Sequence, residues 1–259
     1  MQVLGLSLPL VEPGDDLPSM ILRAADQIGG LRDGDIVVVS SKVVATAEGR
    51  FRELSRMRPS TRAKKIAAKS GQEPELVELI LNEADRVLST CRGAILTIKN
   101  GAICANAGVD LSNAPKGKAI LLPRYPEKAA KALRLALMAG SKAKIAVVIS
   151  DSVVHPLKLG TVGQAIATAG MEPVIDCRGE RDLYGKPLKI TYRAIADQLA
   201  SAAQVVMGEA GERVPVAVAR DVEVKFVEKP TLPLQIPPRK CIYYGSLKPR
   251  GNCRSPRAV

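Results

Sequence analysis

Short apolar runs alternate with helical patterns along this chain, and this alternation limits the fold more than any other feature. Residues 35–40 (DIVVVS) and 144–150 (KIAVVIS) are rich in Val and Ile, which predicts buried strands. Residues 94–98 and 102–104 flank Asn100-Gly101, a dipeptide that favours a tight turn, and so predict a β-hairpin. Strands interleaved with helices indicate a mixed α/β or α+β fold.

Helical spacing of apolar residues recurs in several longer segments. Asp15 and Asp16 precede the first of these and are suited to cap it. We expect helices at residues 17–28, 75–84, 127–138 and 194–206, and further strands at 214–220 and 222–227. The expected fold class is α+β (mixed α/β), a two-subdomain monomer with mixed sheets.

The composition is that of a folded protein without a membrane span. Of 259 residues, 46% are hydrophobic and 25% charged, and no run reaches 18 consecutive apolar residues. The first residues, MQVLGLSLPLVEPGDD, lack the basic and apolar segments of a secretory signal. The five cysteines form no C-x-x-C pair, which is typical of reduced thiols. We therefore expect a cytoplasmic protein with no membrane partner.

The charge is strongly basic, with a formal net charge of +12 and a pI near 9.6. Nucleic acid, an acidic membrane surface and polyanionic small molecules are three partner classes that this charge suits, and a solvated, salt-bridge-rich surface is a fourth explanation. Aromatic residues make up only 3%, which argues against a stacking platform for single strands but leaves phosphate contacts open. Nucleic acid is therefore an unlikely partner.

The usual nucleotide-binding motifs are missing from the sequence. There is no G-x-x-x-x-G-K-S/T loop and no G-x-G-x-x-G after a predicted strand. His155 is the single histidine, which excludes a histidine-rich metal site. Nucleotide chemistry in this chain would have to depend on carboxylates, backbone amides and a metal ion.

Two aspartates stand in settings that suit a metal ion. Asp110 lies in the small-residue segment 104–113 (CANAGVDLSN). Asp151 and Ser152 follow the apolar run 145–149, and open α/β sheets commonly bind ligands at such strand ends. Carboxylate and hydroxyl oxygens favour Mg²⁺ or Mn²⁺. The alternative is that Asp110 caps a turn and Asp151 caps a helix.

Three polar segments also have two interpretations each. Residues 159–170 are rich in glycine and small residues, and they suit either a helix start that faces an anion or close helix packing. Residues 178–186 suit a binding loop or a solvated connection. Residues 207–212 (MGEAGE) indicate a glycine-capped helix end, where Glu209 is either a metal ligand or a surface charge.

Taken together in order, these motifs resemble the coenzyme F-420:L-glutamate ligase family. The resemblance covers about residues 1–245, and the most specific piece is CANAGVDLSN. The other pieces are AEGR at 47–50, SDS at 150–152, HPLKLGTVGQAIATAG at 155–170, RGERDLYGKPL at 178–188 and MGEAGERVP at 207–215, with Pro59-Ser60 and the helix segment 78–83.

The resemblance implies an amide ligase that uses GTP. GTP phosphorylates the terminal carboxylate of the coenzyme precursor, L-glutamate displaces phosphate from the acyl phosphate, and a further glutamate is added through a γ-linkage. It also implies Mg²⁺ or Mn²⁺, two per site, K⁺, and a homodimer. Residues 1–245 would form the catalytic unit, with the active site between two subdomains, and 246–259 a basic Pro/Gly-rich tail.

The resemblance also implies roles for individual residues. Asp110 and Asp151 would hold one divalent ion, and Ser152 and Glu209 would serve a second. The residues that would surround GTP are Leu8, Pro9, Leu10, Val11, Ser41, Lys42, Thr46, Asn113, Met207, Gly208, Glu209, Ala210, Gly211 and Glu212.

The chain also departs from the family pattern. Thr46 stands where many members have lysine, residues 154–158 (VHPLK) replace Gly-Arg-Pro-Trp-Arg, and Arg220-Asp221 replaces Arg-Gly. We expect the 154–158 segment to lie on the side of the coenzyme or glutamate. Two alternatives stay open: a relative with the same GTP and metal chemistry but another acceptor or amino acid, and a basic nucleic-acid-binding protein.

Overall fold

The computed structural model describes residues 1–246, and the chain divides into two compact units. The first contains Met1–Ser55 and Val109–Leu234, and the second contains Arg56–Gly108 and, within the described residues, 235–246. Of the predicted basic tail, residues 247–259 lie outside the described residues.

A five-stranded mixed sheet forms the centre of the first unit, in the order β1-β12-β2-β8-β9. β2 and β8 run parallel, and every other neighbouring pair is antiparallel. The strands are β1 (Gln2–Leu6), β2 (Ile36–Ser40), β8 (Ala146–Val154), β9 (Thr161–Ala169) and β12 (Val216–Arg220). The predicted α+β class with mixed sheets is confirmed.

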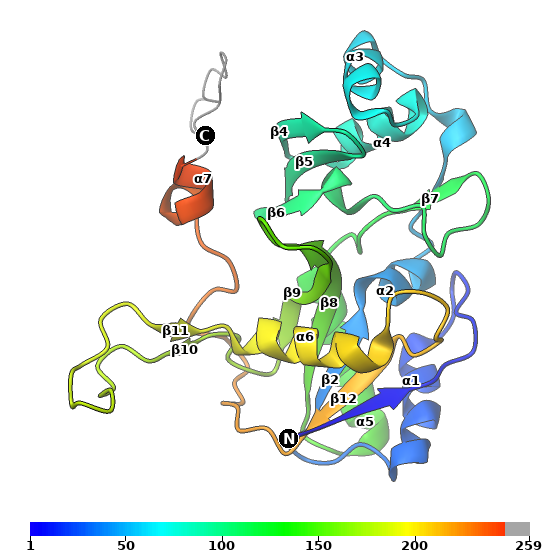
Figure 1. Cartoon of the computed structure of the whole chain (residues 1–259). Helices are drawn as coiled ribbons and strands as arrows, with labels where there is room; N and C mark the ends of the chain where they lie inside the picture. Colours follow the sequence, from blue (N-terminus) through cyan, green and yellow to red (C-terminus); the bar gives the residue numbers. More distant parts are fainter. Residues whose placement is uncertain (247–259) are drawn as a thin grey trace. The chain divides into compact units, whose positions relative to one another are not determined.

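Helices cover both faces of this sheet (Figure 1). Alternate residues of β2 face opposite layers: Val37 and Val39 pack with α1 (Leu17–Ala25) and α5 (Pro126–Ser141), whereas Ile36 and Val38 pack with α6 (Ile195–Met207). All four valine and isoleucine side chains are fully buried. A strand that is covered on both faces reads as a continuous apolar run, as residues 35–40 do.

The helix predictions hold in this unit to within a few residues. Asp16 caps α1, as expected, and accepts a hydrogen bond from the Ser19 backbone N–H at 3.2 Å. Smaller elements complete the unit: α2 (Ser41–Ala47), the pair β3 (Phe51–Glu53) and β7 (Lys118–Ile120), and the pair β10 (Ile175–Asp176) and β11 (Tyr192–Arg193). The sequence analysis did not predict α2, β1, β3 or β7.

Strand β8 is longer than predicted, and this changes the setting of Asp151. The parallel pairing with β2 ends where Ser40 meets Ser150, but β8 continues to Val154 with β9 alone as its partner. Asp151 and Ser152 therefore lie inside β8, just beyond the last residue paired with β2. Because Asp151 is in a strand, the alternative that it caps a helix is wrong.

Within residues 159–170, the strand β9 (Thr161–Ala169) forms, so the alternative of a helix start that faces an anion is wrong. The small residues serve close packing against α6. A Cβ on Gly163 would lie 2.3 Å from the backbone oxygen of Ala200, and the Ser201 hydroxyl donates to the Gly163 carbonyl at 2.7 Å. The glycine thus allows the helix backbone to approach the strand.

The strand predicted at 222–227 is also wrong. This segment makes one isolated bridge, between Met171 and Phe226. Its alternation is nevertheless real, because Val222, Val224 and Phe226 pack on the core under α6 while Glu223 and Lys225 are exposed. The alternation of apolar and polar residues indicated that one side of the segment is buried. A strand also needs a neighbouring strand to pair with, and the alternation carries no information about that.

A buried ion pair fixes the end of β12 to the entry of β2. The Arg220 guanidinium donates to both oxygens of Asp35, Nε to Oδ1 at 2.9 Å and Nη2 to Oδ2 at 2.8 Å. It also donates to the Gly30 carbonyl at 2.9 Å. Asp35 is only 1% exposed, so its charge depends on these donors for stability.

The second unit contains a three-stranded antiparallel sheet and short helices. Its strands are β4 (Arg86–Cys91), β5 (Ala94–Lys99) and β6 (Ala102–Ala105), and its helices are α3 (Thr61–Ser70), α4 (Pro74–Glu83) and α7 (Ile242–Ser246). The predicted hairpin is confirmed, since Lys99 pairs with Ala102 across Asn100 (φ 49°) and Gly101 (φ 78°). The sequence analysis did not predict β4 or α3.

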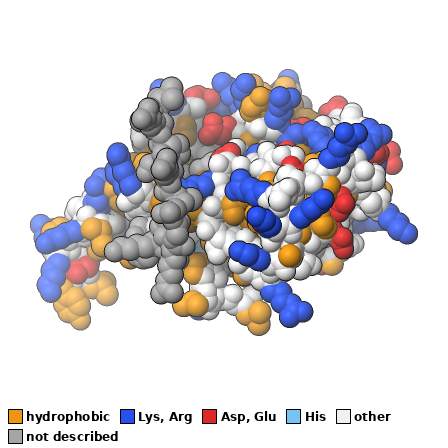
Figure 2. Space-filling view, turned by 90° about the horizontal axis from the view of Figure 1, so that it is seen from above, with side chains coloured by type: hydrophobic (Ala, Val, Ile, Leu, Met, Phe, Trp, Pro, Cys, Tyr) orange, Lys and Arg blue, Asp and Glu red, His pale blue; other side chains and the backbone are white. Residues whose placement is uncertain are grey.

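The surface agrees with the basic composition. The exposed face of α3 carries Arg62, Lys64, Lys65 and Lys69, and Lys and Arg side chains outnumber acidic ones over much of the face drawn in Figure 2. In residues 1–246, no helix combines the length and the apolar character that a bilayer crossing requires.

We predict that Arg220→Leu lowers the free energy of unfolding by about 3–5 kcal/mol, because it leaves the buried Asp35 carboxylate without its partner. Urea denaturation measures the loss. Arg178→Leu is the matched control, since its ion pair with Asp176 has a similar 2.7 Å separation but lies in solvent. Equal losses in the two variants would show that burial does not decide the effect.

Candidate functional site

A pocket of about 860 Å³ opens beside the carboxyl end of β2, and all its lining residues belong to the first unit. This volume is in the range of small-molecule sites. Five segments distant in sequence supply the walls. They are 8–13, 40–51, 113–118, 150–152 and 204–215.

Helix α2 positions two acidic side chains through neighbouring residues. It begins at Ser41, directly after β2, so its first turn lies where the parallel strands end. The Ser41 hydroxyl donates to Asp151 Oδ1 at 2.6 Å, and Lys42 Nζ lies 2.6 Å from Asp110 Oδ2. Residues 110 and 151, which are far apart in sequence, are thereby held by two consecutive residues.

The pKa values of the two aspartates shift in opposite directions. Burial raises the pKa of the Asp151 carboxyl, and the nearby Asp110 charge acts in the same direction, against the hydrogen bond from Ser41. Burial also acts against ionisation of Asp110, but Lys42 and Ser112 outweigh it, so the pKa of that carboxyl is lowered. The carboxylate form of Asp110 is therefore stabilised by its surroundings, whereas the donors around Asp151 do not offset the burial of its charge.

Glu209 joins the strands of the sheet to the end of α6. Its carboxylate accepts from the Ser152 hydroxyl at 2.8 Å, from the Thr161 hydroxyl at 3.1 Å and from the Gln204 amide. Ser152 comes from β8 and Thr161 from β9, whereas Glu209 follows the helix. This arrangement gathers oxygen atoms from three elements at one edge of the pocket.

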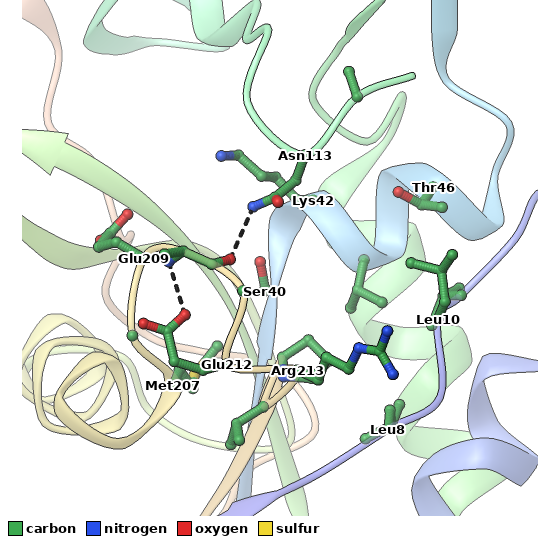
Figure 3. Close-up of a pocket in the computed structure, with 18 of the residues that line it drawn as sticks. Leu8, Leu10, Ser40, Lys42, Thr46, Asn113, Met207, Glu209, Glu212 and Arg213 are labelled. Carbon is green, nitrogen blue, oxygen red and sulfur yellow. Dashed lines mark hydrogen bonds between the residues drawn. The ribbon is translucent and has the colours of Figure 1, made fainter. Parts of the chain in front are cut away.

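The 207–212 segment turns sharply after α6, as predicted for a glycine-capped helix end. Gly208 has φ 70°, and a Cβ there would lie 2.3 Å from the Glu212 carboxyl carbon. The Ala210 N–H donates to Glu212 at 2.7 Å, and its carbonyl accepts from the Asn113 amide at 3.3 Å. Both bonds are drawn in Figure 3. Asn113 thus holds this loop against the opposite wall.

The other side of the pocket is apolar. Figure 3 shows Leu8, Leu10 and Thr46 on this side, across from Lys42, Asn113 and Glu209. Leu10 lines the pocket but is 73% exposed, so its side chain is not part of the hydrophobic core. The Arg213 side chain extends between the two sides, toward Leu8 and Leu10. An apolar wall facing a polar one suits a ligand with a flat ring and an ionic tail.

The structure brings the predicted site residues together. Those that line the pocket are Leu8, Pro9, Leu10, Val11, Lys42, Thr46, Asn113, Asp151, Ser152, Met207, Gly208, Glu209, Ala210, Gly211 and Glu212. Ser41 is buried beneath Asp151, and Asp110 meets the pocket through Lys42. Asp110 also accepts from the Ser112 N–H at 2.8 Å, so its expected turn-capping role coexists with its contact to Lys42. That the site lies between two subdomains stays a prediction.

Sequence reasoning missed several lining residues, among them Ser40, Phe51, Lys118, Gln204 and Arg213. Ser40 ends a predicted strand and Gln204 lies in the last turn of a predicted helix, so their proximity to the site could have been inferred. Phe51 and Lys118 lie on the β3–β7 pair, which carried no sequence signal. Arg213 has φ 57°, and nothing in its sequence context indicated that conformation.

Comparison with known proteins gives the family. The model for "F420-0:Gamma-glutamyl ligase" matches residues 5–221. The chain belongs to this family. It is 41% identical over 215 residues to the Coenzyme F420:L-glutamate ligase of Methanothermobacter thermautotrophicus, a match that covers 82% of this chain and 85% of the relative. The relative from Methanopyrus kandleri with the same name is 42% identical over 214 residues, 82% of this chain and 83% of that protein.

A third ligase of this name, from Methanocaldococcus jannaschii, is 40% identical over 227 residues, which are 87% of this chain and 90% of the relative. The motifs that suggested the family in the sequence all lie inside residues 5–221. Of these motifs, 104–113, 150–152 and 207–215 contribute residues to the pocket wall, whereas the others lie outside it.

The donor atoms of the pocket in this ligase-family chain fit a hard divalent cation. Asp110, Asp151, Ser152 and Glu209 all offer oxygen, and the Lys42 ammonium already lies against Asp110 as a cation. Among residues 1–246, no three His, Cys, Asp or Glu side chains gather closely enough to hold a metal ion alone. A Mg²⁺-type ion that keeps waters and binds substrate phosphates suits such a sparse donor set.

We predict that Asp151→Asn is more stable than the wild type near pH 7. Because burial raises the pKa of the Asp151 carboxyl, its charged form destabilises the fold. Protonation removes that penalty, so the advantage of the variant should shrink as pH falls from about 7 to about 4. Urea denaturation across this range measures the difference, and a variant less stable at pH 7 would contradict the prediction.

Asp176→Asn provides the control of opposite sign. The Arg178 side chain lowers the pKa of Asp176 to about 2, so the ionised form of this exposed carboxyl is the favoured one in the folded protein. Removing that charge should give no stabilisation at any pH in the range.

Proposed function

We propose that this protein is a GTP-dependent ligase that joins L-glutamate by an amide bond to the coenzyme F420 precursor. The observation that carries the proposal is the pocket, in which Lys42 and Glu209 lie across from Leu8 and Leu10 (Figure 3) and Asp151 also belongs to the lining. The family and the name shared by the relatives, Coenzyme F420:L-glutamate ligase, support the choice of substrates.

The proposed reaction has two steps. An oxygen of the terminal carboxylate of the precursor attacks the γ-phosphorus of GTP, and GDP leaves. The amine of L-glutamate then attacks the acyl carbon, phosphate leaves, and the amine proton passes to the medium. A second cycle adds a further glutamate through a γ-linkage. The products of each cycle are the amide, GDP and phosphate.

The first step needs positive charge because two anions must meet. Like charges about 4 Å apart repel by roughly 4 kcal/mol at an effective dielectric near 20. Lys42, Lys118 and Arg213 line the pocket and supply fixed positive charge for the phosphates. In this proposal Asp110 and Asp151 hold one Mg²⁺ or Mn²⁺, and Ser152 and Glu209 serve a second. When bound, these ions would neutralise the phosphate oxygens.

The remaining residues would bind and orient the nucleotide. The apolar side formed by Leu8, Pro9, Leu10, Val11 and half-buried Thr46 suits a nucleobase. Because Thr46 carries no charge, this side offers hydrogen bonding and packing and no ion pair. Asn113 holds the 207–212 loop, which would close over the phosphates.

We further propose a homodimer and a requirement for K⁺, in line with the family resemblance. Fully exposed apolar side chains support the dimer. Leu157 and Leu159 lie at the turn between β8 and β9, and Leu183 and Ile190 lie in the segment between β10 and β11. A shared interface between two copies of the chain would remove these side chains from water. We propose a cytoplasmic location, with no membrane or nucleic-acid partner.

An alternative acceptor is the second candidate, and one segment favours it. Residues 154–158 depart from the family pattern, and His155 and Leu157 are exposed at the turn after β8. If this segment contacts the acceptor, the same GTP chemistry would serve a different acid or amine.

We predict that GDP forms only when the F420 precursor and L-glutamate are both present with GTP and Mn²⁺. Mass spectrometry of the coenzyme should show the mass of one added glutamate residue, then of a second. Turnover with another acid or amine, and none with this pair, would select the alternative acceptor. Salt-dependent binding to RNA or DNA, with no turnover of GTP, would refute the ligase proposal.

We predict that Asp151→Asn lowers turnover at saturating GTP and Mn²⁺ by at least about 10²-fold, because an amide cannot replace a carboxylate that holds a cation near transferring phosphate. Single-turnover GDP release measures the loss, and Asp176→Asn should turn over normally. Unchanged turnover in Asp151→Asn would remove this residue from the proposed site.

A further inference from the structure

Lys42 occupies the oxygen that a metal ion on Asp110 would use. Its ammonium lies 2.6 Å from Asp110 Oδ2 and donates to the Ser112 hydroxyl at 2.7 Å. The same Oδ2 accepts from that hydroxyl at 2.9 Å, and Oδ1 accepts from the Ser112 N–H at 2.8 Å. Both oxygens of Asp110 are therefore engaged. Of the groups that donate to them in residues 1–246, Lys42 is the one that carries a positive charge.

The Lys42 charge also acts on the second aspartate. The fields of Lys42 and Asp110 both reach the Asp151 carboxyl, with opposite effects on its ionisation. The ammonium is thus the counter-charge near both carboxylates. A divalent cation bound to the same oxygen would repel the ammonium, because the two positive charges would lie only a few ångströms apart, at roughly 4 Å or less.

The Lys42 side chain can move away from Asp110 while its backbone stays in place. Lys42 is 28% exposed and lines the pocket, while its backbone is fixed in α2. A lysine has a flexible four-carbon stem and a compact charge, so it can exchange one anion for another without moving its helix. Lys118, the other lysine of the pocket, lies 4.0 Å from Glu53 and has no contact with either aspartate among the interactions of residues 1–246.

We propose that Lys42 is an exchangeable cation that couples metal loading to nucleotide loading. A divalent cation displaces its ammonium from Asp110, and the freed ammonium then binds the polyphosphate of the nucleotide. Conversely, a nucleotide that draws Lys42 away uncovers Asp110 for the metal. The inference deepens the proposed function, on which it rests, and assigns Lys42 a positioning role toward Asp110.

Two consequences follow from this exchange. First, Lys42 competes with the metal, so removal of its charge should strengthen metal binding even though the residue serves the reaction. Second, the coupling must be reciprocal, because the metal changes nucleotide affinity by the same factor as the nucleotide changes metal affinity. A lysine that merely attracts phosphate would repel the metal weakly through space, so its removal would strengthen metal binding only slightly.

The first test measures Mn²⁺ binding without nucleotide, from the EPR signal of free Mn²⁺. Lys42→Met should bind Mn²⁺ at least about tenfold more tightly than the wild type, within the usual range of coupling between sites. Lys118→Met removes the same charge from the same pocket and should change the affinity by less than about twofold. Equal or weaker Mn²⁺ binding by Lys42→Met would overturn the inference.

The second test uses the wild-type protein and so does not depend on the folding of a variant. Lysine amines are labelled with a limiting dose of acetic anhydride and located by peptide mass spectrometry. Mn²⁺ alone should raise labelling of Lys42 severalfold, and GDP with Mn²⁺ should lower it again. Lys118 labelling should not respond to Mn²⁺ alone. Unchanged Lys42 labelling would overturn the exchange.

The two proposals fail in different ways. If the wild type binds Mn²⁺ and turns over GTP but Lys42→Met shows no tighter binding, the exchange is wrong and the ligase function stands. If Mn²⁺ binding and Lys42 labelling behave as expected while no glutamate is joined, the exchange holds and the choice of substrates is wrong. No binding of Mn²⁺ by the wild type would overturn both the exchange and the metal site.

Discussion

The parallel pairing of β2 with β8 is the constraint on which the candidate site depends. It brings Ser40 beside Ser150, so the residues that follow each strand leave the sheet at the same edge. On one side the chain turns into α2, and on the other β8 continues with β9. Ser41 and Asp151 therefore meet although 110 positions separate them in the sequence. A one-residue shift of this register would point the Asp151 side chain to the other face.

The same strands also show how differently the fold treats its acidic groups. Asp35, at the entry of β2, is fully paired with Arg220 and supports the structure. Asp151, at the other end of the parallel pair, has a hydrogen bond from Ser41 but no cation of its own in direct contact among the described residues. A buried carboxylate without a cationic partner destabilises the fold and can bind a positively charged ligand. Such groups are common at functional sites.

Much of the fold could be predicted from sequence where one pattern had one structural solution. The runs at 35–40 and 144–150, the Asn100-Gly101 turn and the helix caps had such patterns. Residues 159–170 did not, because small residues permit close packing of a strand as well as of a helix, and only the presence of α6 decides between them. The register of β2 with β8, which joins Ser41 to Asp151, depends on contacts between distant segments and has no local signal.

The candidate site was predictable to the extent that residues lie within recognisable motifs. Lys42, Asn113 and the 207–212 loop were found through the family resemblance, whereas Lys118 lies outside the quoted motifs and Arg213, although it lies inside MGEAGERVP, was given no role. Asp221 illustrates the reverse case. Its φ of 57° is a left-handed conformation that glycine adopts readily, which explains why the family often has Arg-Gly where this chain has Arg220-Asp221.

The contact at Gly163 has a consequence for the reach of Glu209. Strand β9 carries Thr161, and α6 leads directly to Glu209, so the spacing between strand and helix sets the separation of these two side chains. With only a hydrogen atom between the two backbones, that spacing is already at its minimum. The helix can move outward but not inward. An outward movement of α6 would carry Glu209 away from Thr161 and lengthen the 3.1 Å bond between them, whereas the contact at Gly163 opposes an inward movement.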